Sequence, residues 1–464
     1  MKGRDILGRL FGTSGVRGVV NEELTAEIAV RLGKAIGTYF EDTVVIASDT
    51  RDSGGMIKAA VAAGLMSVGA RVIDIGVAPT PALQYYVGSH DGMSGGVMIT
   101  ASHNPPEFNG IKCIGPTGQE LIREGEEKIE SLFEEDIECK EWDAVGTFEY
   151  GSNAIERYID AILRRVDAAA IRAAKFTVVL DCANGAACVS TPLLLSRLGV
   201  RAITLNANPQ GDFPGHPSEP TEENLRDLIA LVRSTGADLG IAHDGDADRV
   251  IFISDTAEYV SGEKSLALVA KYVLSNRPGL VVTPVSSSSM VEEVVKEMES
   301  TIMYTAIGSP IVARAMFENK AVFGGEENGG LIFPKHQLCR DGAMSVAAML
   351  ECMVKGGKLS EQLETLPKYY TEKRKIDCPN SLKSSLLRHL KEVNKTVRAD
   401  MTDGLKLLYD DGWVLARPSG TEPKFRIYSE SKDKDMALHR ANETEIKAIE
   451  FVERVLTPAN KDDA

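Results

Sequence analysis

The sequence predicts an α/β protein in which three related α/β domains are followed by a smaller C-terminal α+β domain. Apolar, β-rich runs alternate with helical stretches through most of the chain, and hairpin-like runs replace this alternation near the C-terminus. Alternating strands and helices are typical of parallel α/β layers. The 464 residues also exceed what one hydrophobic core usually organises, so we expect several domains.

The repeated unit is a strand, a loop rich in Gly, Asp or Ser, a helix and a second strand. In the first repeat, a strand at 43–50 precedes a helix over 56–68 and a strand at 71–76. The equivalent ranges are 176–181, 191–198 and 200–206 in the second repeat, and 279–285, 291–298 and 301–308 in the third. A further helix is expected after Pro310. Three such repeats predict three related domains, although their sequences share no close identity.

The C-terminal part of the chain has a different pattern. A predicted helix at 382–393 precedes two hairpin-like runs, 405–417 and 424–431, and a polar helix from Lys434 to about Val455 follows. An Asp-Gly pair is typical of hairpin turns, so we expect the first run to turn at Asp411-Gly412. The predicted domains are 1–150, 151–253, 254–368 and 369–464.

Composition limits the classes of partner. The formal net charge of −15 argues against nucleic acid, because a phosphate backbone requires a broad basic surface. No apolar run approaches the roughly 18 residues needed to cross a membrane. Seven isolated cysteines favour reduced thiols. We therefore expect a cytoplasmic protein without nucleic-acid or membrane partners, and the sequence does not indicate its oligomeric state.

The run GGVMITASHNPPEFNGIK, residues 95–112, places Ser102 and His103 on a loop after a predicted strand that ends at Thr100. Loops at strand ends of α/β layers commonly present reactive groups. A serine here also suits a turn or a helix cap. A neighbouring histidine would suit a hydrolase, but no G-x-S-x-G motif surrounds this serine. The motif alone leaves a catalytic and a structural serine open.

The run DLGIAHDGDADRVIFIS, residues 238–254, places Asp244, Asp246 and Asp248 between two predicted strands, with Arg249 next to them. Three carboxylates so close together repel one another unless a cation lies between them. Oxygen ligands on a tight loop suit Mg²⁺, which also accepts a phosphate oxygen as a ligand. A solvated acidic turn is the alternative, and the EF-hand pattern does not fit. Because strands flank the loop, we expect a partly buried metal site.

The run FGGEENGGLIF, residues 323–333, places Glu326, Glu327 and Asn328 in a glycine-rich loop between strand-like residues. Carboxylate and amide groups of this kind suit hydrogen bonds to sugar hydroxyl groups. A surface turn has the same composition, so the motif alone does not decide between the two.

The run RPSGTEPKFR, residues 417–426, follows a predicted strand and places a tight turn between two arginines. Ser419, Gly420 and Thr421 offer backbone and hydroxyl donors, and Arg417 and Arg426 lie on either side. Such donors between two guanidinium groups favour a phosphate-binding site. A purely structural turn would not explain the two arginines.

A fifth run, LFGTSGVRG at residues 10–18, places Arg17 on a glycine-rich loop. On its own, this run is best explained as a flexible segment before the first helix. It therefore indicates a function only in combination with the other motifs.

The motifs TASHNP, DGDADR, GEENGG and RPSGTEP occur in the order that is typical of α-D-phosphohexomutases. The chain resembles this family along its whole length, and it resembles the archaeal members most. The family includes phosphoglucomutase, phosphomannomutase and phosphoglucosamine mutase. The resemblance implies four domains around a central cleft, each with one site loop. It also implies that a phosphoserine interconverts hexose 6-phosphate and hexose 1-phosphate through a sugar 1,6-bisphosphate, which serves as intermediate and activator.

The resemblance also implies roles for individual residues. Ser102 would be the phosphoserine and would share Mg²⁺ with the three aspartates of the second motif. Arg17, His103, Lys112 and Arg249 would line the reaction centre. The residues implied to bind the substrate are Gly308, Ser309, Glu326, Asn328, Arg417, Ser419, Gly420, Thr421 and Arg426.

Two positions depart from the family pattern. Relatives often have histidine where this chain has Gly330, so proton transfer would fall to Lys112, His103 or a water. Lys112 would need a lowered pKa to act as a base. Relatives that act on glucose or mannose phosphates often have serine where this chain has Asn328. This difference favours glucosamine phosphate as the substrate, with mannose or glucose phosphate next.

Two other functions are compatible with parts of the sequence. An aspartate-nucleophile sugar phosphatase would use Asp244 as the nucleophile and Asp246 as the acid and base. Asp248 then occupies a position where such enzymes usually have Thr or Val, and Ser102 and Arg417 have no role. A non-catalytic sensor of sugar phosphates would not need a metal-binding loop beside a serine.

Overall fold

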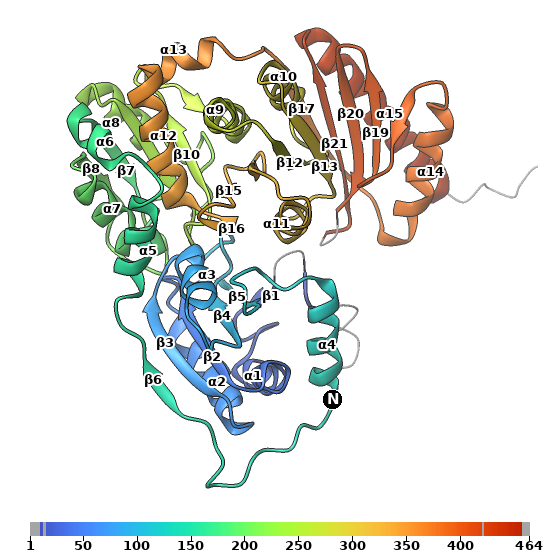
Figure 1. Cartoon of the computed structure of the whole chain (residues 1–464). Helices are drawn as coiled ribbons and strands as arrows, with labels where there is room; N and C mark the ends of the chain where they lie inside the picture. The colour runs from blue at the N-terminus through green and yellow to red at the C-terminus, as the bar shows by residue number, and fades with distance from the viewer. Residues whose placement is uncertain (1–9, 13–14, 420–421, 457–464) are drawn as a thin grey trace, which may run out of the picture.

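The computed structural model describes residues 10–12, 15–419 and 422–456 and contains four β-sheets that follow one another along the chain (Figure 1). The first three sheets combine parallel and antiparallel neighbours, and the fourth is antiparallel throughout. Successive domains form an arc in Figure 1, from the blue first domain to the orange fourth domain. The predicted fold class, three α/β domains and a smaller α+β domain, is confirmed.

The first sheet has buried central strands with helices packed against it. Its strands, in spatial order, are β1 (Val16–Val19), β5 (Phe108–Ile114), β4 (Gly95–Ile99), β2 (Thr43–Ser48), β3 (Arg71–Val77) and β6 (Phe148–Tyr150). Its helices are α1 (Ala26–Phe40), α2 (Gly54–Ser67), α3 (Thr80–Ser89) and α4 (Arg123–Glu134). Helices α1 and α2 approach closely where Gly33 of α1 faces Gly64 of α2. A Cβ on Gly64 would lie 2.2 Å from the Val30 carbonyl oxygen. Continuous apolar runs such as β2 are typical of strands covered on both faces.

The second and third sheets have five strands each. The second has the order β11 (Tyr259–Val260), β10 (Val250–Ile253), β9 (Leu239–His243), β7 (Thr177–Asp181) and β8 (Arg201–Leu205), with α5 (Ala154–Leu163), α6 (Ala168–Ala174), α7 (Thr191–Arg197) and α8 (Arg226–Thr235). The third has the order β13 (Thr301–Thr305), β12 (Leu280–Pro284), β14 (Phe323–Gly325), β15 (Leu331–Phe333) and β16 (Gln337–Arg340), with α9 (Gly262–Asn276), α10 (Ser289–Glu297), α11 (Ser309–Glu318), α12 (Gly342–Gly356) and α13 (Leu359–Glu364). The domain boundaries near 150, 253 and 368 stay predictions. The second sheet extends beyond residue 253, because its last strand, β11, ends at Val260.

The fourth sheet has the order β17 (Tyr370–Asp377), β21 (Lys424–Ser431), β20 (Gly412–Pro418), β19 (Leu405–Tyr409) and β18 (Arg398–Asp400). Helices α14 (Lys383–Val393) and α15 (Lys434–Leu456) pack against it. Tyr409 pairs with Gly412 across the β19–β20 hairpin. The turn is therefore formed by Asp410 and Asp411, one residue before the predicted Asp411-Gly412, because Gly412 is already part of the strand.

The three α/β domains share one topology. In each, three parallel strands are followed by a strand that reverses direction, and the connection at this reversal carries a site motif. The connections are β4–β5 with Ser102, β9–β10 with the aspartates and β14–β15 with Glu326. The prediction of parallel layers was therefore incomplete. The antiparallel strands create the sharp turns on which the motifs lie.

The first three domains also share a hydrophobic core. One cluster of buried apolar side chains extends from Leu83 in the first domain through Tyr158 in the second to Met349 in the third. The fourth domain has a separate core. A small cluster at its edge packs Trp413 and Leu415 against Val285 of the third domain. The fourth domain is thus attached to the other three through a much smaller apolar contact.

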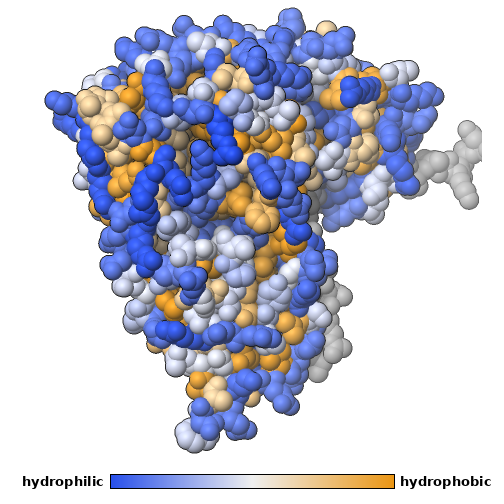
Figure 2. All heavy atoms as spheres, in the orientation of Figure 1, coloured by the Kyte–Doolittle hydropathy of each residue, from blue (hydrophilic) through white to orange (hydrophobic). Residues whose placement is uncertain are grey.

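The exterior is mainly hydrophilic on the face that Figure 2 shows, with hydrophobic residues in small groups between the polar ones. Within the described ranges, none of the helices combines the length and the apolar character that crossing a membrane requires.

Candidate active site

The loops of the first three α/β domains meet at one network of buried charged side chains. Ser102 Oγ donates a hydrogen bond of 3.0 Å to Asp244 Oδ2, and Lys112 Nζ lies 2.7 Å from Asp246 Oδ2. Arg340 extends the network to the third domain, where it pairs with Glu326 at 2.8 Å. Ser102, the aspartate loop and the sugar-loop glutamate, which the sequence placed on separate motifs, are therefore neighbours.

Ser102 is held in an unusual backbone conformation. Its φ is +54°, in the left-handed region that residues other than glycine adopt only rarely. Its backbone N–H donates to Thr100 Oγ1 at 2.8 Å, and its hydroxyl also receives a contact of 3.3 Å from Arg249 Nη2. The side chain is buried, with the residue only 2% exposed. The serine hydroxyl is thus fixed beside a cation and a carboxylate.

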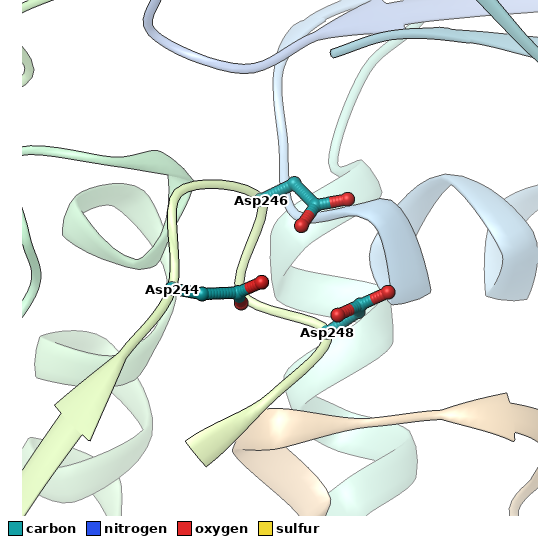
Figure 3. Close-up of side chains that lie close together, drawn as sticks. All are labelled: Asp244, Asp246 and Asp248. Carbon is teal, nitrogen blue, oxygen red and sulfur yellow. The ribbon is translucent and has the colours of Figure 1, made fainter. Parts of the chain in front are cut away.

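The aspartate loop is a tight turn between β9 and β10. Ala247 has a φ of +56°, and a Cβ on Gly245 would lie 2.5 Å from the Ser102 carbonyl oxygen. Glycine at 245 is therefore required for the close approach of this loop to the serine loop. Figure 3 shows the carboxylates of Asp244, Asp246 and Asp248 turned toward a common space.

Asp244 is a fully buried carboxylate whose ion pair is with Arg249. The guanidinium of Arg249 contacts Asp244 Oδ2 through Nε at 2.9 Å and Nη2 at 2.8 Å. Burial nevertheless raises the pKa of Asp244 to about 7, although the charge of Arg249 opposes the rise. A further cation beside this carboxylate would favour its charged form.

Asp246 and Lys112 form a buried ion pair. Thr80 Oγ1 also donates to Asp246 Oδ2, at 2.6 Å. Burial disfavours ionisation of Asp246, but the charge and hydrogen bond of Lys112, the Thr80 hydrogen bond and the charge of Arg340 together outweigh burial and lower the pKa of this carboxyl. Burial likewise disfavours the charged amine, but Asp246 and Asp248 outweigh it and raise the pKa of Lys112. Lys112 thus stays protonated in this arrangement, which is the opposite of what a general base requires.

Arg340 was not recognised in the sequence. Its guanidinium lies between the second and third motifs, where it contacts Asp248 and Glu326 and is only 11% exposed. Burial opposes its charge, but these two carboxylates outweigh burial and raise its pKa well above the ordinary value. The available signal was an arginine at the end of strand β16, directly before the helix-capping Asp341.

The three aspartates fit a divalent cation. One oxygen from each carboxylate lies within 4.8 Å of the others, and all three residues are buried. Among the described residues, no donor forms a hydrogen bond with Asp246 Oδ1 or Asp248 Oδ1. Buried carboxylate oxygens normally accept hydrogen bonds, so two that accept none within this cluster favour a cation that they would coordinate. An all-oxygen ligand set of this kind suits Mg²⁺.

Two further predicted residues lie next to Ser102. His103 Nδ1 is 3.4 Å from Ser102 Oγ. Burial, together with the charges of Arg249 and Arg17, lowers the pKa of His103 to about 2, so the imidazole is neutral at pH 7. Arg17 is on strand β1 and donates through Nη1 to Asn104 Oδ1 at 2.8 Å.

The residues predicted to bind the sugar, in the run 323–333 and at Gly308 and Ser309, differ in exposure. Glu326 is buried, and burial raises its pKa although Arg340 opposes the rise. Asn328 is exposed, and its Oδ1 accepts from the Gly330 backbone N–H at 3.1 Å. Gly308, with a φ of +139°, precedes Ser309 at the start of helix α11.

The predicted phosphate-binding residues form a second group in the fourth domain. Arg417 and Arg426 are paired opposite each other on strands β20 and β21. Arg417 contacts Asp403 at 3.2 Å, and Asp403 accepts from the Ile307 backbone N–H at 3.0 Å. This bridge places the arginine near the loop of Gly308. Ser419 is buried, whereas Gly420 and Thr421 lie outside the described residues.

Other residues that hold the site were also not recognised. Thr80 contacts Asp246, and Lys383 Nζ donates to the carbonyl oxygens of Ser419 and Glu422, each at 2.6 Å. Each is the first residue of a helix, α3 and α14 respectively, which is an ordinary place for a polar residue. Their partners are distant in sequence, so local pattern alone carried no signal for them.

The fold and the site define a class of enzyme that transfers phosphoryl groups, since a buried serine, a set of carboxylates that fit a divalent cation and cationic side chains meet at one place. Family models of the phosphoglucomutase/phosphomannomutase domains match the chain. The α/β/α domains I, II and III match residues 8–139, 156–257 and 261–370, and the C-terminal domain matches residues 375–447. The chain belongs to the phosphoglucomutase/phosphomannomutase family.

Individual relatives agree with this assignment. A phosphoglucomutase/phosphomannomutase from Thermococcus kodakarensis is 45% identical over 441 residues, which cover 93% of this chain and 96% of that protein. A phosphoglucosamine/phosphogalactosamine mutase from Sulfurisphaera tokodaii is 42% identical over 448 residues, with coverages of 94% and 98%. The crystal structure of a family protein from Burkholderia thailandensis has a TM-score of 0.85 at 27% identity and covers 96% of this chain and 97% of that one. The phosphatase alternative receives no support from these relatives.

Proposed function

We propose that this phosphohexomutase interconverts hexose 6-phosphate and hexose 1-phosphate through phosphorylated Ser102 and a sugar 1,6-bisphosphate. The observation that carries the proposal is the environment of the Ser102 hydroxyl. It contacts Asp244 and Arg249, and Asp244 shares its turn with Asp246 and Asp248, each of which has one buried oxygen without a hydrogen-bond partner among the described residues. A phosphate on Ser102 would enter a place that already offers a cation and room for metal ligands.

The proposed reaction consists of two phosphoryl transfers between Ser102 and the sugar, and no phosphate is released. The bond from phosphorus to Ser102 Oγ breaks, a bond from phosphorus to the free sugar hydroxyl forms, and the hydroxyl proton leaves for a base. The bisphosphate then returns its other phosphoryl group to Ser102, so the serine ends the cycle phosphorylated. Mg²⁺ held by Asp244, Asp246 and Asp248 would supply positive charge to the transferring oxygens. Arg249 supplies charge on the same hydroxyl from the protein itself.

Proton transfer requires an acceptor that is not already protonated. Lys112 is protonated in its ion pair with Asp246, so we assign it to charge stabilisation. His103 is neutral and adjacent to Ser102 Oγ. A phosphate dianion on Ser102 would raise the pKa of this imidazole, because opposite charge favours the protonated form. We therefore propose His103 as the acceptor, with a water as the alternative.

The phosphate that is not transferred requires its own site. Arg417 and Arg426 lie side by side on the fourth sheet, and Arg417 Nε has no hydrogen-bond partner among the described residues. We propose that these arginines, Ser419, Gly420 and Thr421 bind this phosphate. The apolar contact between the third and fourth domains is much smaller than the core that the first three domains share. It would allow the fourth domain to move while the bisphosphate reorients.

Glucosamine phosphate is the proposed preferred substrate, followed by mannose and glucose phosphates. A 2-ammonium group needs acceptors, and the sugar loop provides Glu326, half-buried Glu327 and the Asn328 amide oxygen. Gly308 and Ser309 would contact the hydroxyl groups of the same sugar. The relatives include proteins named for glucosamine phosphate as well as for glucose and mannose phosphates.

A cytoplasmic location is proposed as well. All seven cysteines are free thiols, which favours a reducing compartment. Hexose phosphates are the small-molecule partners that this proposal requires, and the net charge of −15 remains the argument against nucleic acid.

The test is the initial rate on the 6-phosphates of glucosamine, mannose and glucose, with Mg²⁺ and a trace of the 1,6-bisphosphate. A preference above about tenfold for glucosamine 6-phosphate, which equals roughly 1.4 kcal/mol, supports the proposed substrate. Comparable rates would indicate a broad phosphohexomutase, and release of inorganic phosphate without isomerisation would contradict the proposal.

A further inference from the structure

Arg51 follows strand β2 and has a fully buried guanidinium that contacts the serine loop. Its two terminal nitrogens donate hydrogen bonds to four carbonyl oxygens of this loop. The acceptors are Ser102 at 2.9 Å, Asn104 at 2.6 Å, Pro105 at 2.6 Å and Phe108 at 2.9 Å. Nε uses the remaining donor on Asp49 at 3.1 Å. All five donors of the guanidinium are therefore engaged, four of them on one loop.

Asp49 closes this arrangement into a ring. It accepts from Arg51 and also from Thr100 Oγ1, at 2.6 Å. Thr100 Oγ1 in turn accepts from the Ser102 backbone N–H at 2.8 Å. The backbone of Ser102 is thus bound at both its N–H and its carbonyl group, and both contacts lead back to the same Asp49–Arg51 pair.

The second domain packs on the other side of Arg51. The Arg51 guanidinium carbon lies 5.0 Å from the centre of the Phe213 ring, which is a cation–π distance. A Cβ on Gly211 would lie 2.1 Å from the Asp52 backbone nitrogen, so this loop touches the segment that carries Arg51. The two domains that supply Ser102 and the aspartates are therefore in contact through Arg51 as well.

Ser102 needs such support because its left-handed φ is unfavourable for a residue with a Cβ. This conformation directs the hydroxyl toward Asp244 and Arg249. If the loop relaxed to an ordinary conformation, the hydroxyl would lose this direction. The rigid, planar guanidinium group of Arg51 is hydrogen-bonded to four carbonyl groups of the loop and therefore opposes that relaxation.

We propose that Arg51 is a positioning residue that holds Ser102 in the orientation needed to receive and release the phosphoryl group. The inference rests on the proposed function of Ser102 for its kinetic consequence. Arg51 does not reach the substrate, because its guanidinium is fully buried and all five of its donors are used on the protein. Loss of Arg51 therefore affects the chemical step more than substrate binding.

The variants are Arg51→Met, which removes the donors, and Arg51→Lys, which keeps the charge. A lysine has one nitrogen and cannot reach four carbonyl groups and Asp49 together. Arg71→Met serves as the matched control, because Arg71 is a half-exposed arginine of the same domain, paired with Glu149. Wild-type protein and the three variants are first compared by thermal melting to define the temperature range of folded protein.

Kinetics provides the first readout on the full-length enzyme. We expect kcat to fall on the order of a hundredfold in Arg51→Met, with KM for the hexose 6-phosphate nearly unchanged, because misplacement of a reacting group acts on the chemical step. Arg51→Lys should fall by a similar factor, and added methylguanidinium should restore part of the activity of Arg51→Met only. Unchanged kcat, or an equal loss in Arg71→Met, would overturn the proposal.

Amide hydrogen exchange provides a readout that does not depend on mutase activity. We expect faster exchange at residues 100–110 in both Arg51 variants, with the fourth domain unchanged. Unchanged exchange in this loop would overturn the positioning role even if the enzyme is an active mutase. If wild-type protein isomerises none of the sugars while exchange still accelerates, the proposed function fails and the positioning of Ser102 by Arg51 stands.

Discussion

Ser102 Oγ and Asp244 Oδ2 are joined by a hydrogen bond of 3.0 Å, although the two residues are 142 positions apart in the sequence. The bond connects the turn after β4 in the first domain with the turn after β9 in the second. The two turns occupy equivalent places in two related sheets. A repeated topology thus brings Ser102 and the three clustered aspartates together.

Removal of divalent cations should abolish isomerisation, and added Mg²⁺ should restore it. Asp248→Asn should weaken Mg²⁺ binding, because it removes one of the three buried carboxylates. Asp160→Asn is the control, since Asp160 is a half-exposed aspartate paired with Arg197 on the surface of the second domain. Titration of Mg²⁺ followed by calorimetry measures the affinity without reference to activity. Equal Mg²⁺ affinity in Asp248→Asn and wild type would contradict the assigned site.

Arg340→Met should destabilise the protein by about 3–5 kcal/mol, because it leaves Asp248 and Glu326 buried without their shared cation. A second change, Glu326→Gln, should restore part of the loss. The measurement is the unfolding midpoint in denaturant for the two single variants and the double variant. Strict additivity of the two changes would show that Arg340 does not couple these carboxylates.

Arg417→Gln should raise KM for hexose phosphates by about tenfold to a hundredfold, in line with about 1.5–3 kcal/mol for a hydrogen bond to a charged group. The control is Arg388→Gln on helix α14, whose guanidinium contacts only Ser385 among the hydrogen bonds described for it. Steady-state kinetics at saturating Mg²⁺ distinguishes the two. A normal KM in Arg417→Gln would place the phosphate elsewhere.

Lys406 should make the attachment of the fourth domain depend on pH. Its amine donates to the Val285 carbonyl oxygen at 2.6 Å and lies over the rings of Tyr304 and Trp413. Burial lowers the pKa of Lys406 to about 8, although Glu430, Asp400 and Glu292 oppose the shift. Because the folded pKa is below the unfolded one, unfolding takes up a proton between these values, and stability rises with pH from about 8 toward about 10.4.

The comparison that isolates this effect is Lys406→Met. The difference in unfolding free energy between wild type and the variant should change in favour of wild type by about 3 kcal/mol over that pH range. Denaturant unfolding at several pH values measures it. A difference that does not vary with pH would mean that Lys406 keeps an ordinary pKa.

The sequence was informative where the signal is local. Continuous apolar runs predicted β2, β7 and β12, and the strand pair that carries Arg417 and Arg426 was expected as two β runs around a tight turn. The short strands β1 and β6 were not predicted, since four and three residues contain too little pattern.

The site was predictable as a set of motifs but not as a network. Arg340 and Asp248 are 92 positions apart, and Thr80 and Asp246 are 166 positions apart. No local spacing in the sequence therefore predicts either contact. The pKa of Lys112 also depends on the buried aspartates around it, which only the folded chain brings together. These contacts arise from the way in which three sheets meet.

Ser102 is proposed to carry the transferred phosphoryl group. The most direct measurement is peptide mass spectrometry of wild-type protein and Ser102→Ala after reaction with a hexose 1,6-bisphosphate, together with the isomerisation rate of each. We expect one phosphoryl group on the peptide that contains Ser102 in wild type, and neither this modification nor isomerisation in Ser102→Ala. Isomerisation that persists in Ser102→Ala, or a phosphoryl group found on another residue, would contradict the claim.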